Sequence, residues 1–93
     1  MKKNQLKKEF EEIVSSMTDK DIDDAIEIIK NTDGVRKVEM VDEKIDDGCD
    51  DNEHNDYVIM RSYNIDYKGR SFYVRFYYGD CDGLIGCYDV RNN

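Results

Sequence analysis

Residues 63–78 read YNIDYKGRSFYVRFYY, and they give the clearest indication of the fold. Aromatic and β-branched residues alternate with polar ones on both sides of Lys68-Gly69, a pattern typical of two strands joined by a two-residue turn. The register set by this turn gives an apolar face that only Arg61 interrupts. On that face the register pairs Ile65 with Phe72, Tyr63 with Val74 and Ile59 with Tyr78.

The chain after residue 79 turns back through Asp80-Cys81-Asp82-Gly83. A three-residue loop that ends at Gly83 gives better cross-strand pairs than a two-residue turn, because it matches apolar with apolar and basic with acidic side chains. We therefore expect a meander of three strands over residues 57–91. The preferred register pairs Phe76 with Tyr88, Val74 with Val90, Arg75 with Asp89 and Tyr73 with Arg91.

Upstream of this meander the apolar residues follow a helical period. They predict one helix at about residues 4–17 and a second at about 19–31, which Gly34 closes in the left-handed conformation of a C-terminal cap. The valine-rich residues 35–41 predict a strand. The expected fold class is α+β, a single domain over residues 1–93 in the order ααβ–acidic loop–βββ. Its N-terminal helical hairpin packs on one face of a four-stranded antiparallel sheet.

Negative charge is concentrated in one segment. The 93 residues carry 22 acidic and 14 basic side chains, a net charge of −8, and residues 42–56 account for −7 of it. Mutual repulsion in such a run favours a solvated acidic loop or an interaction segment, and we expect a loop over 42–56. The acidic balance argues against direct binding to nucleic acid or to an anionic membrane, because both require a cationic surface.

Several other classes are excluded by pattern. The longest apolar runs have two to four residues, far short of the roughly 18–20 that span a bilayer. The basic N-terminus is followed by charged residues and has no apolar core, so we do not expect a signal peptide. Three cysteines are an odd number and do not form a closed secreted framework, so we expect a cytoplasmic protein.

No catalytic motif is evident, and we expect a protein that is not an enzyme and has no cofactor. His54 is the only histidine, and the carboxylates around it disfavour both a buried base and a cysteine nucleophile at Cys49. Cys49 and His54, with Cys81 and Cys87, supply four zinc ligands at spacings that do not match structural sites. Loose calcium binding by the carboxylates of the acidic loop stays open as an alternative.

The remaining expectation is a binding protein whose partner carries a basic groove for nucleic acid. Tyrosine and arginine are enriched at interfaces, so the sheet face opposite the helices is a second candidate, either for the same contact or for a homodimer. Each feature also has an interpretation without a partner: the acidic loop keeps the domain soluble, and the alternating tyrosines suit a half-exposed strand. The candidate binding residues are Asp46, Asp47, Asp50, Asp51, Glu53 and Asp56 in the loop, Asp23, Asp24 and Glu27 on the second helix, and Tyr73, Arg75 and Tyr77 on the sheet.

In size, acidity and the run DDGCDDNE at residues 46–53, the chain resembles the small phage-encoded inhibitors of bacterial defence, the anti-CRISPR and DNA-mimic proteins. This resemblance is one of composition and carries no shared motif. It implies stoichiometric inhibition of a CRISPR effector or other nuclease in the cytosol of a bacterial host. Two alternatives stay open: an immunity protein that neutralises a basic nuclease toxin, and a domain whose loop binds calcium or zinc.

Overall fold

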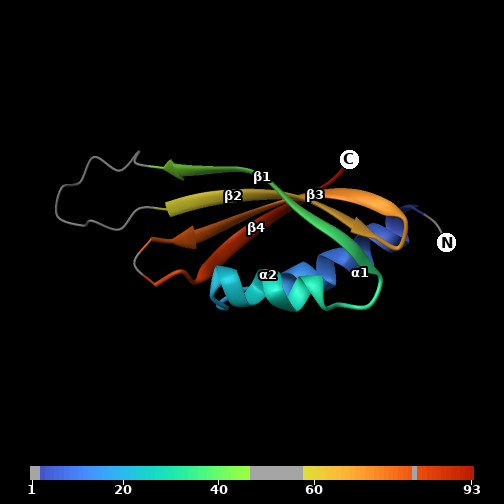
Figure 1. Cartoon of the computed structure of the whole chain (residues 1–93), viewed down its shortest axis with the longest axis horizontal. Coiled ribbons are helices and arrows are strands. Elements are labelled where there is room, and N and C mark those ends of the chain that lie inside the picture. Colours follow the sequence, from blue (N-terminus) through green and yellow to red (C-terminus); the bar gives the residue numbers. More distant parts are fainter. Residues whose placement is uncertain (1–2, 47–57, 81) are drawn as a thin grey trace.

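The computed structural model describes residues 3–46, 58–80 and 82–93. The strands form one antiparallel sheet in the order β1-β2-β3-β4, and the helices precede it in the chain (Figure 1). The α+β class expected from the sequence is confirmed. The elements are α1 (Lys3–Ser15), α2 (Ile22–Lys30), β1 (Val35–Asp46), β2 (Val58–Tyr67), β3 (Arg70–Gly79) and β4 (Ile85–Asn92).

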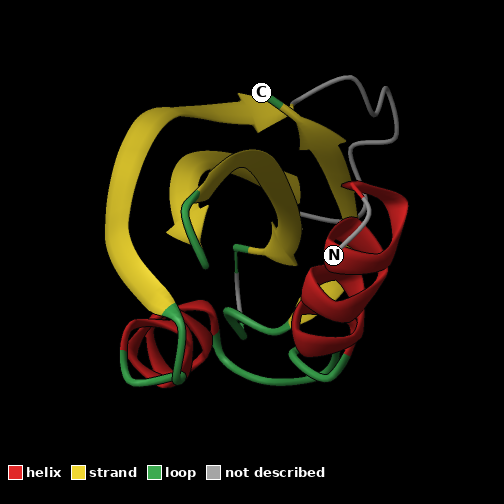
Figure 2. Ribbon diagram, turned by 90° about the vertical axis from the view of Figure 1, so that its right-hand side faces the viewer, coloured by secondary structure: helices red, strands yellow, loops and turns green. Residues whose placement is uncertain are grey.

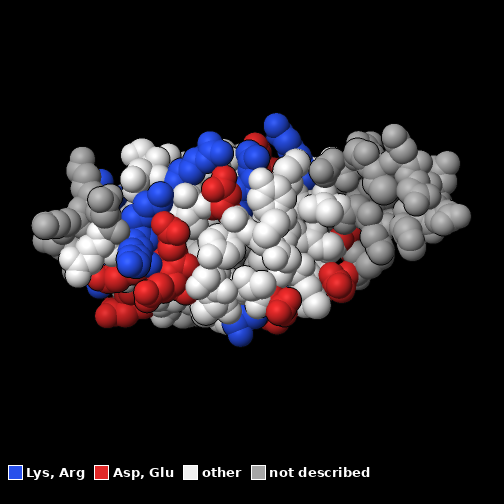
Figure 3. All heavy atoms as spheres, turned by 180° about the vertical axis from the view of Figure 1, so that it is seen from behind, with Lys and Arg blue, Asp and Glu red and all other residues white. Residues whose placement is uncertain are grey.

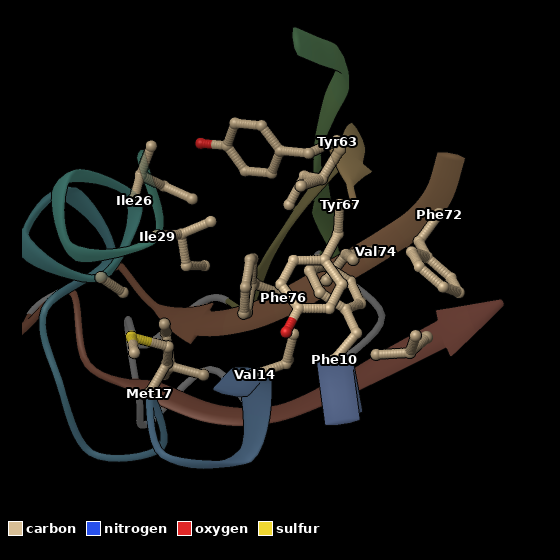
Figure 4. Close-up of a cluster of buried hydrophobic side chains, with 14 of the residues drawn as sticks. Phe10, Val14, Met17, Ile26, Ile29, Tyr63, Tyr67, Phe72, Val74 and Phe76 are labelled. Atoms are coloured by element: carbon tan, nitrogen blue, oxygen red, sulfur yellow. The ribbon is translucent and has the colours of Figure 1, made fainter. Parts of the chain in front are cut away.

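The sheet curls so that its strands arch over both helices (Figure 2). Apolar side chains from α1 and α2 meet the inward-facing aromatic residues of β2 and β3 in a single core (Figure 4). Phe10 is fully buried, and its ring stacks on Phe72 with the centroids 4.7 Å apart. Because one face of each central strand packs inward, the alternate residues of β3 must lie on the outer face of the sheet.

Both predicted hairpin registers are confirmed. Tyr67 pairs with Arg70 across the Lys68-Gly69 turn, where both turn residues have the positive φ of a type I′ hairpin. In the second hairpin all four predicted pairs of β3 and β4 are present. The ladder then shifts, because Tyr77 pairs with Cys87 whereas Tyr78 pairs with Ile85. The residue between them, Gly86, makes the bulge that was not predicted.

The helix boundaries differ from the prediction. The second helix begins at Ile22 rather than residue 19, because Asp19 has a φ of 71° and the backbone around it pairs with the β3–β4 turn. The first helix ends at Ser15 rather than residue 17, although the following Met17 is still buried in the core. Gly34 has the predicted positive φ of 94°, but it lies in the turn before β1 and not at the helix cap.

β1 runs five residues beyond its predicted end, so the first third of the predicted acidic loop is strand. The cause is Arg61, which faces inward and whose Nη2 lies 2.6 Å from Oε2 of Glu43. The same carboxylate oxygen accepts a hydrogen bond of 2.7 Å from the Tyr78 hydroxyl, and Arg61 donates to the Tyr63 hydroxyl at 3.2 Å. A cross-strand partner therefore offsets the charge of Glu43 and allows β1 to continue.

Two carboxylates make the stability of the fold sensitive to acid. Hydrogen bonds from Tyr78 and then Arg61 lower the pKa of Glu43 below its usual 4.5. Lys68 and then Tyr67 lower the pKa of Glu9 in the same way, with the Lys68 Nζ 3.0 Å from the carboxylate. Each group adds stability above its unfolded pKa and loses it as the pH falls through its lower folded pKa.

We therefore expect the urea midpoint of unfolding to fall as the pH drops from about 6 to about 3. Glu43→Gln should flatten part of this profile, since the amide keeps the shape of the side chain but does not titrate. Glu12→Gln, at an exposed site on α1, provides the matched control. If Glu43→Gln left the profile as steep as the control, the contacts of Glu43 would not be responsible for the acid sensitivity.

Candidate functional site

A groove lies between the start of α2 and the β3–β4 turn, with a volume of about 560 Å³. We call it the acidic groove. Volumes of this size are typical of sites that accept side chains or small ligands. Its lining residues are Asp19, Lys20, Asp21, Asp24, Glu27, Ile28 and Leu84.

The helix places one wall of the acidic groove. Asp21 caps α2, because its Oδ1 accepts a hydrogen bond of 2.9 Å from the backbone N–H of Asp23. Asp24 and Ile28 follow at three and seven residues from the cap, so the three side chains form one stripe along the helix. Because the opposite face of α2 is buried in the core, this stripe faces outward.

The β3–β4 turn supplies the other wall and is tied to the helix through the backbone. Ile22 N–H donates to the Gly83 carbonyl at 2.8 Å, and Ile85 N–H donates to the Lys20 carbonyl at 2.9 Å. Gly83 has a φ of 71°, and a Cβ added there would lie 2.7 Å from Oδ2 of Asp21. The close approach of these two walls therefore depends on a glycine at position 83.

Four carboxylates line the acidic groove against one ammonium group, that of Lys20. Among the described residues, none of the four makes an ion pair with a lysine or arginine. Their field is therefore directed at solvent and at whatever enters the groove. Asp23 differs, because its carboxylate lies 3.5 Å from Nη1 of Arg61 and lines a neighbouring hollow between α2 and β1.

The predicted binding residues divide into groups that the structure does not bring together. Asp24 and Glu27 lie in the acidic groove as a pair, whereas Asp23 contacts Arg61. Asp46 is the last residue of β1. The other five candidate binding residues of the predicted loop lie outside the described residues: Asp47, Asp50, Asp51, Glu53 and Asp56.

The tyrosine–arginine group lies on the outer face of the sheet, on the side away from the helices. Arg75 donates from Nη2 to the Tyr73 hydroxyl at 3.1 Å and from Nε to the Ser62 hydroxyl at 3.2 Å. Hydrogen bonding by Ser62 and then Arg75 lowers the pKa of Tyr73. Ser62 is fully buried beneath these side chains, and Tyr77 is half-buried beside them. This group therefore packs as a unit, and the sheet separates it from the carboxylates of α2.

Charge on the back of the molecule is mixed. Figure 3 shows acidic and basic side chains side by side at the end that carries the N-terminus, while much of the middle of this face is uncharged. Within the described part of this face, the carboxylates do not form the long row of one sign that would imitate a duplex backbone. Four carboxylates without an ion-pair partner among the described residues line the acidic groove.

The candidate binding residues predicted from the sequence include Asp24 and Glu27 but none of the other five residues that line the acidic groove: Asp19, Lys20, Asp21, Ile28 and Leu84. The helical spacing of Asp21, Asp24 and Ile28 would have placed these three side chains on one stripe if the start of the helix had been predicted at Ile22. Leu84 carries no such signal, because its position depends on how a turn 60 residues downstream docks on the helix.

The metal alternatives fall mainly beyond what the structure describes. Within residues 3–46, 58–80 and 82–93, no group of three or more histidine, cysteine, aspartate or glutamate side chains is placed to hold a metal ion. Cys49, His54 and Cys81 lie outside the described residues. Cys87 is exposed and pairs with Tyr77 on the outer face of the sheet.

The chain matches no protein-family model, no curated protein and no solved structure in the three comparisons made. Neither of the two described helices has the length and apolar character needed to cross a membrane. The acidic groove itself is therefore the basis for a functional assignment.

Proposed function

We propose that this chain is a non-enzymatic acidic binding protein of the cytosol. In this proposal it inhibits a nucleic-acid-handling effector, such as a CRISPR effector or another nuclease, by occupying the effector's basic nucleic-acid-binding surface. The observation that carries the proposal is the set of four carboxylates in the acidic groove, which have no ion-pair partner among the described residues.

Negative charge on this chain favours a basic partner in two ways. Exposed carboxylates attract a basic surface over about 8–10 Å at physiological salt, so they accelerate encounter and favour a cationic partner over a neutral one. Residues 47–57 add five acidic side chains and no lysine or arginine to the sequence, and so increase the negative charge of the chain. A partner that normally binds phosphates supplies the complementary charge.

The groove also supports specificity. A flat acidic surface attracts any cation, whereas a hollow with fixed walls can favour a partner of matching shape. The backbone hydrogen bonds between residues 20–22 and 83–85 hold the two walls in place before a partner arrives. Less conformational freedom then has to be lost on binding.

The test begins with capture from a bacterial lysate and ends with competition. The baits are the wild type, the double variant Asp24→Asn/Glu27→Gln and the triple variant Asp47→Asn/Asp50→Asn/Asp51→Asn. Bound proteins are eluted in salt steps and identified. The purified partner is then mixed with its nucleic acid and this chain. We expect the first variant to bind about three- to tenfold more weakly, since exposed ion contacts contribute roughly 0.2–1 kcal/mol each.

The matched control is Glu12→Gln/Glu39→Gln, which removes the same charge from two exposed positions on α1 and β1. It should bind and elute as wild type does. A partner that holds its nucleic acid and this chain at the same time would overturn the proposal. A partner that is a secreted nuclease toxin would assign the same surface to an immunity role.

A further inference from the structure

Two apolar side chains line the acidic groove, and this feature goes beyond general charge attraction. Ile28 from α2 and Leu84 from the β3–β4 turn both line the groove, and each has 42% of its surface exposed. From these two side chains and the carboxylates around them we infer the chemistry of the occupant. We propose that the groove binds a short segment of a partner protein in which lysines or arginines flank one large aliphatic side chain. This inference rests on the proposed function and specifies how the partner is recognised.

The placement of Ile28 and Leu84 in one groove distinguishes them from scattered apolar residues. A single exposed leucine or isoleucine is normal on a small domain and needs no explanation. Here two of them come from segments far apart in the sequence and line the same hollow. An aliphatic side chain placed between them removes apolar surface from water on both sides, which adds affinity that salt does not screen.

The charged part selects the class of occupant. The acidic groove has four carboxylates and one ammonium group beside its two apolar side chains, so a neutral apolar segment would bury carboxylates without compensation. A segment with cationic side chains on both sides of its apolar residue pairs with these carboxylates instead. An acidic or phosphate-bearing occupant is disfavoured by repulsion.

The geometry of Leu84 indicates that the groove exists before a partner binds. Its backbone N–H donates to Oδ1 of Asp82 at 3.0 Å, and its carbonyl accepts from Gly79 N–H at 3.2 Å. Its two neighbours hydrogen-bond to the segment that leads into α2. A side chain left exposed on a backbone held at so many points is a rigid anchor site.

The test uses three synthetic peptides with blocked ends: Lys-Lys-Leu-Lys-Lys, Lys-Lys-Ser-Lys-Lys and Glu-Glu-Leu-Glu-Glu. Each is titrated into the isotope-labelled full chain, and amide chemical shifts are followed at about 50 mM and about 500 mM salt. We expect the first peptide to shift the amides of residues 19–28 and 83–85, and to bind at least about fivefold more tightly than the serine peptide. This preference should persist at high salt, and the acidic peptide should not bind.

Two variants locate the apolar contact. Ile28→Ser and Leu84→Ser should each reduce the preference for the leucine peptide, while both keep the folded amide spectrum because the two side chains are exposed. Ile45→Ser, at a 64% exposed position at the end of β1, is the control and should leave the preference unchanged.

The outcomes separate this inference from the proposed function. Equal binding of the leucine and serine peptides, lost at high salt, would overturn the inference and leave a purely electrostatic surface, as the proposed function requires. Shifts confined to other residues, or no shifts with any peptide, would also overturn it. Concentration-dependent shifts of the groove amides without peptide would overturn it as well, since a second copy of the chain would then be the occupant. The competition experiment with nucleic acid judges the proposed function independently of all three.

Discussion

We expect Phe10→Ala to lower the free energy of unfolding by about 3–5 kcal/mol, the range typical of truncating a buried phenylalanine. The side chain has no exposed surface, stacks on Phe72 and lies 5.4 Å from the Tyr67 ring, measured between centroids. Truncation removes the aromatic contacts of α1 with both strands of the first hairpin at once. Total stability of such a domain is about 5–15 kcal/mol, so the loss is a large fraction of it.

Urea unfolding followed by circular dichroism measures this change, with the slope of the transition as a check that the native state is unaltered. Ile45→Ala serves as the control, because Ile45 is also a large apolar residue but lies mostly in solvent. It should cost about 0.5 kcal/mol or less. A loss below about 1 kcal/mol for Phe10→Ala would show that α1 does not depend on this contact.

The second large effect is expected at Gly83. Alanine there must adopt a φ near 71°, which costs about 1–2 kcal/mol, and its Cβ would approach Oδ2 of Asp21 to 2.7 Å. Moving that carboxylate weakens the cap of α2 by about 1 kcal/mol more. We expect Gly83→Ala to lower the free energy of unfolding by about 2–3 kcal/mol and to shift the amides on both walls of the acidic groove.

Gly69→Ala is the matched control for this substitution. Gly69 also has a positive φ, of 83°, but nothing lies within 4 Å of an added Cβ. It should therefore show the backbone cost alone. The difference between the two variants should vanish in an Asp21→Ser background, since serine keeps a capping oxygen and removes the crowded one. Equal costs in the wild-type background would mean that position 83 does not set the width of the groove.

Much of the sheet was predictable from local pattern. The turn at Lys68-Gly69 has a residue preference that fixes the register, and the pairs of charged and apolar residues then selected the register of the second hairpin. The alternation of residues along β3 also identified the outer face correctly, including the location of Tyr73 and Arg75 there. These features depend on residues that are close in sequence.

The two largest differences come from contacts between distant segments. The extent of β1 was underestimated because a run of acidic residues suggests a loop unless the partner of Glu43, an inward-facing arginine on β2, is known. The start of α2 was misplaced because the backbone of residues 19–22 pairs with the β3–β4 turn. For the same reason the helical carboxylates were predicted as a candidate site, but the part of Leu84 in lining the groove was not.

The pairing of residues 19–22 with residues 83–85 determines when the acidic groove can form during synthesis. The two walls of the acidic groove are separated by about 60 residues of chain, and that span contains three of the four strands. A nascent chain that has completed α2 already has the carboxylates of the helix, but it lacks the opposite wall until residue 85 has left the ribosome. The acidic groove therefore forms only after residues 83–85 have been made, when the β3–β4 turn docks on the segment that leads into α2, and a chain that stops before these residues lacks one of its two walls.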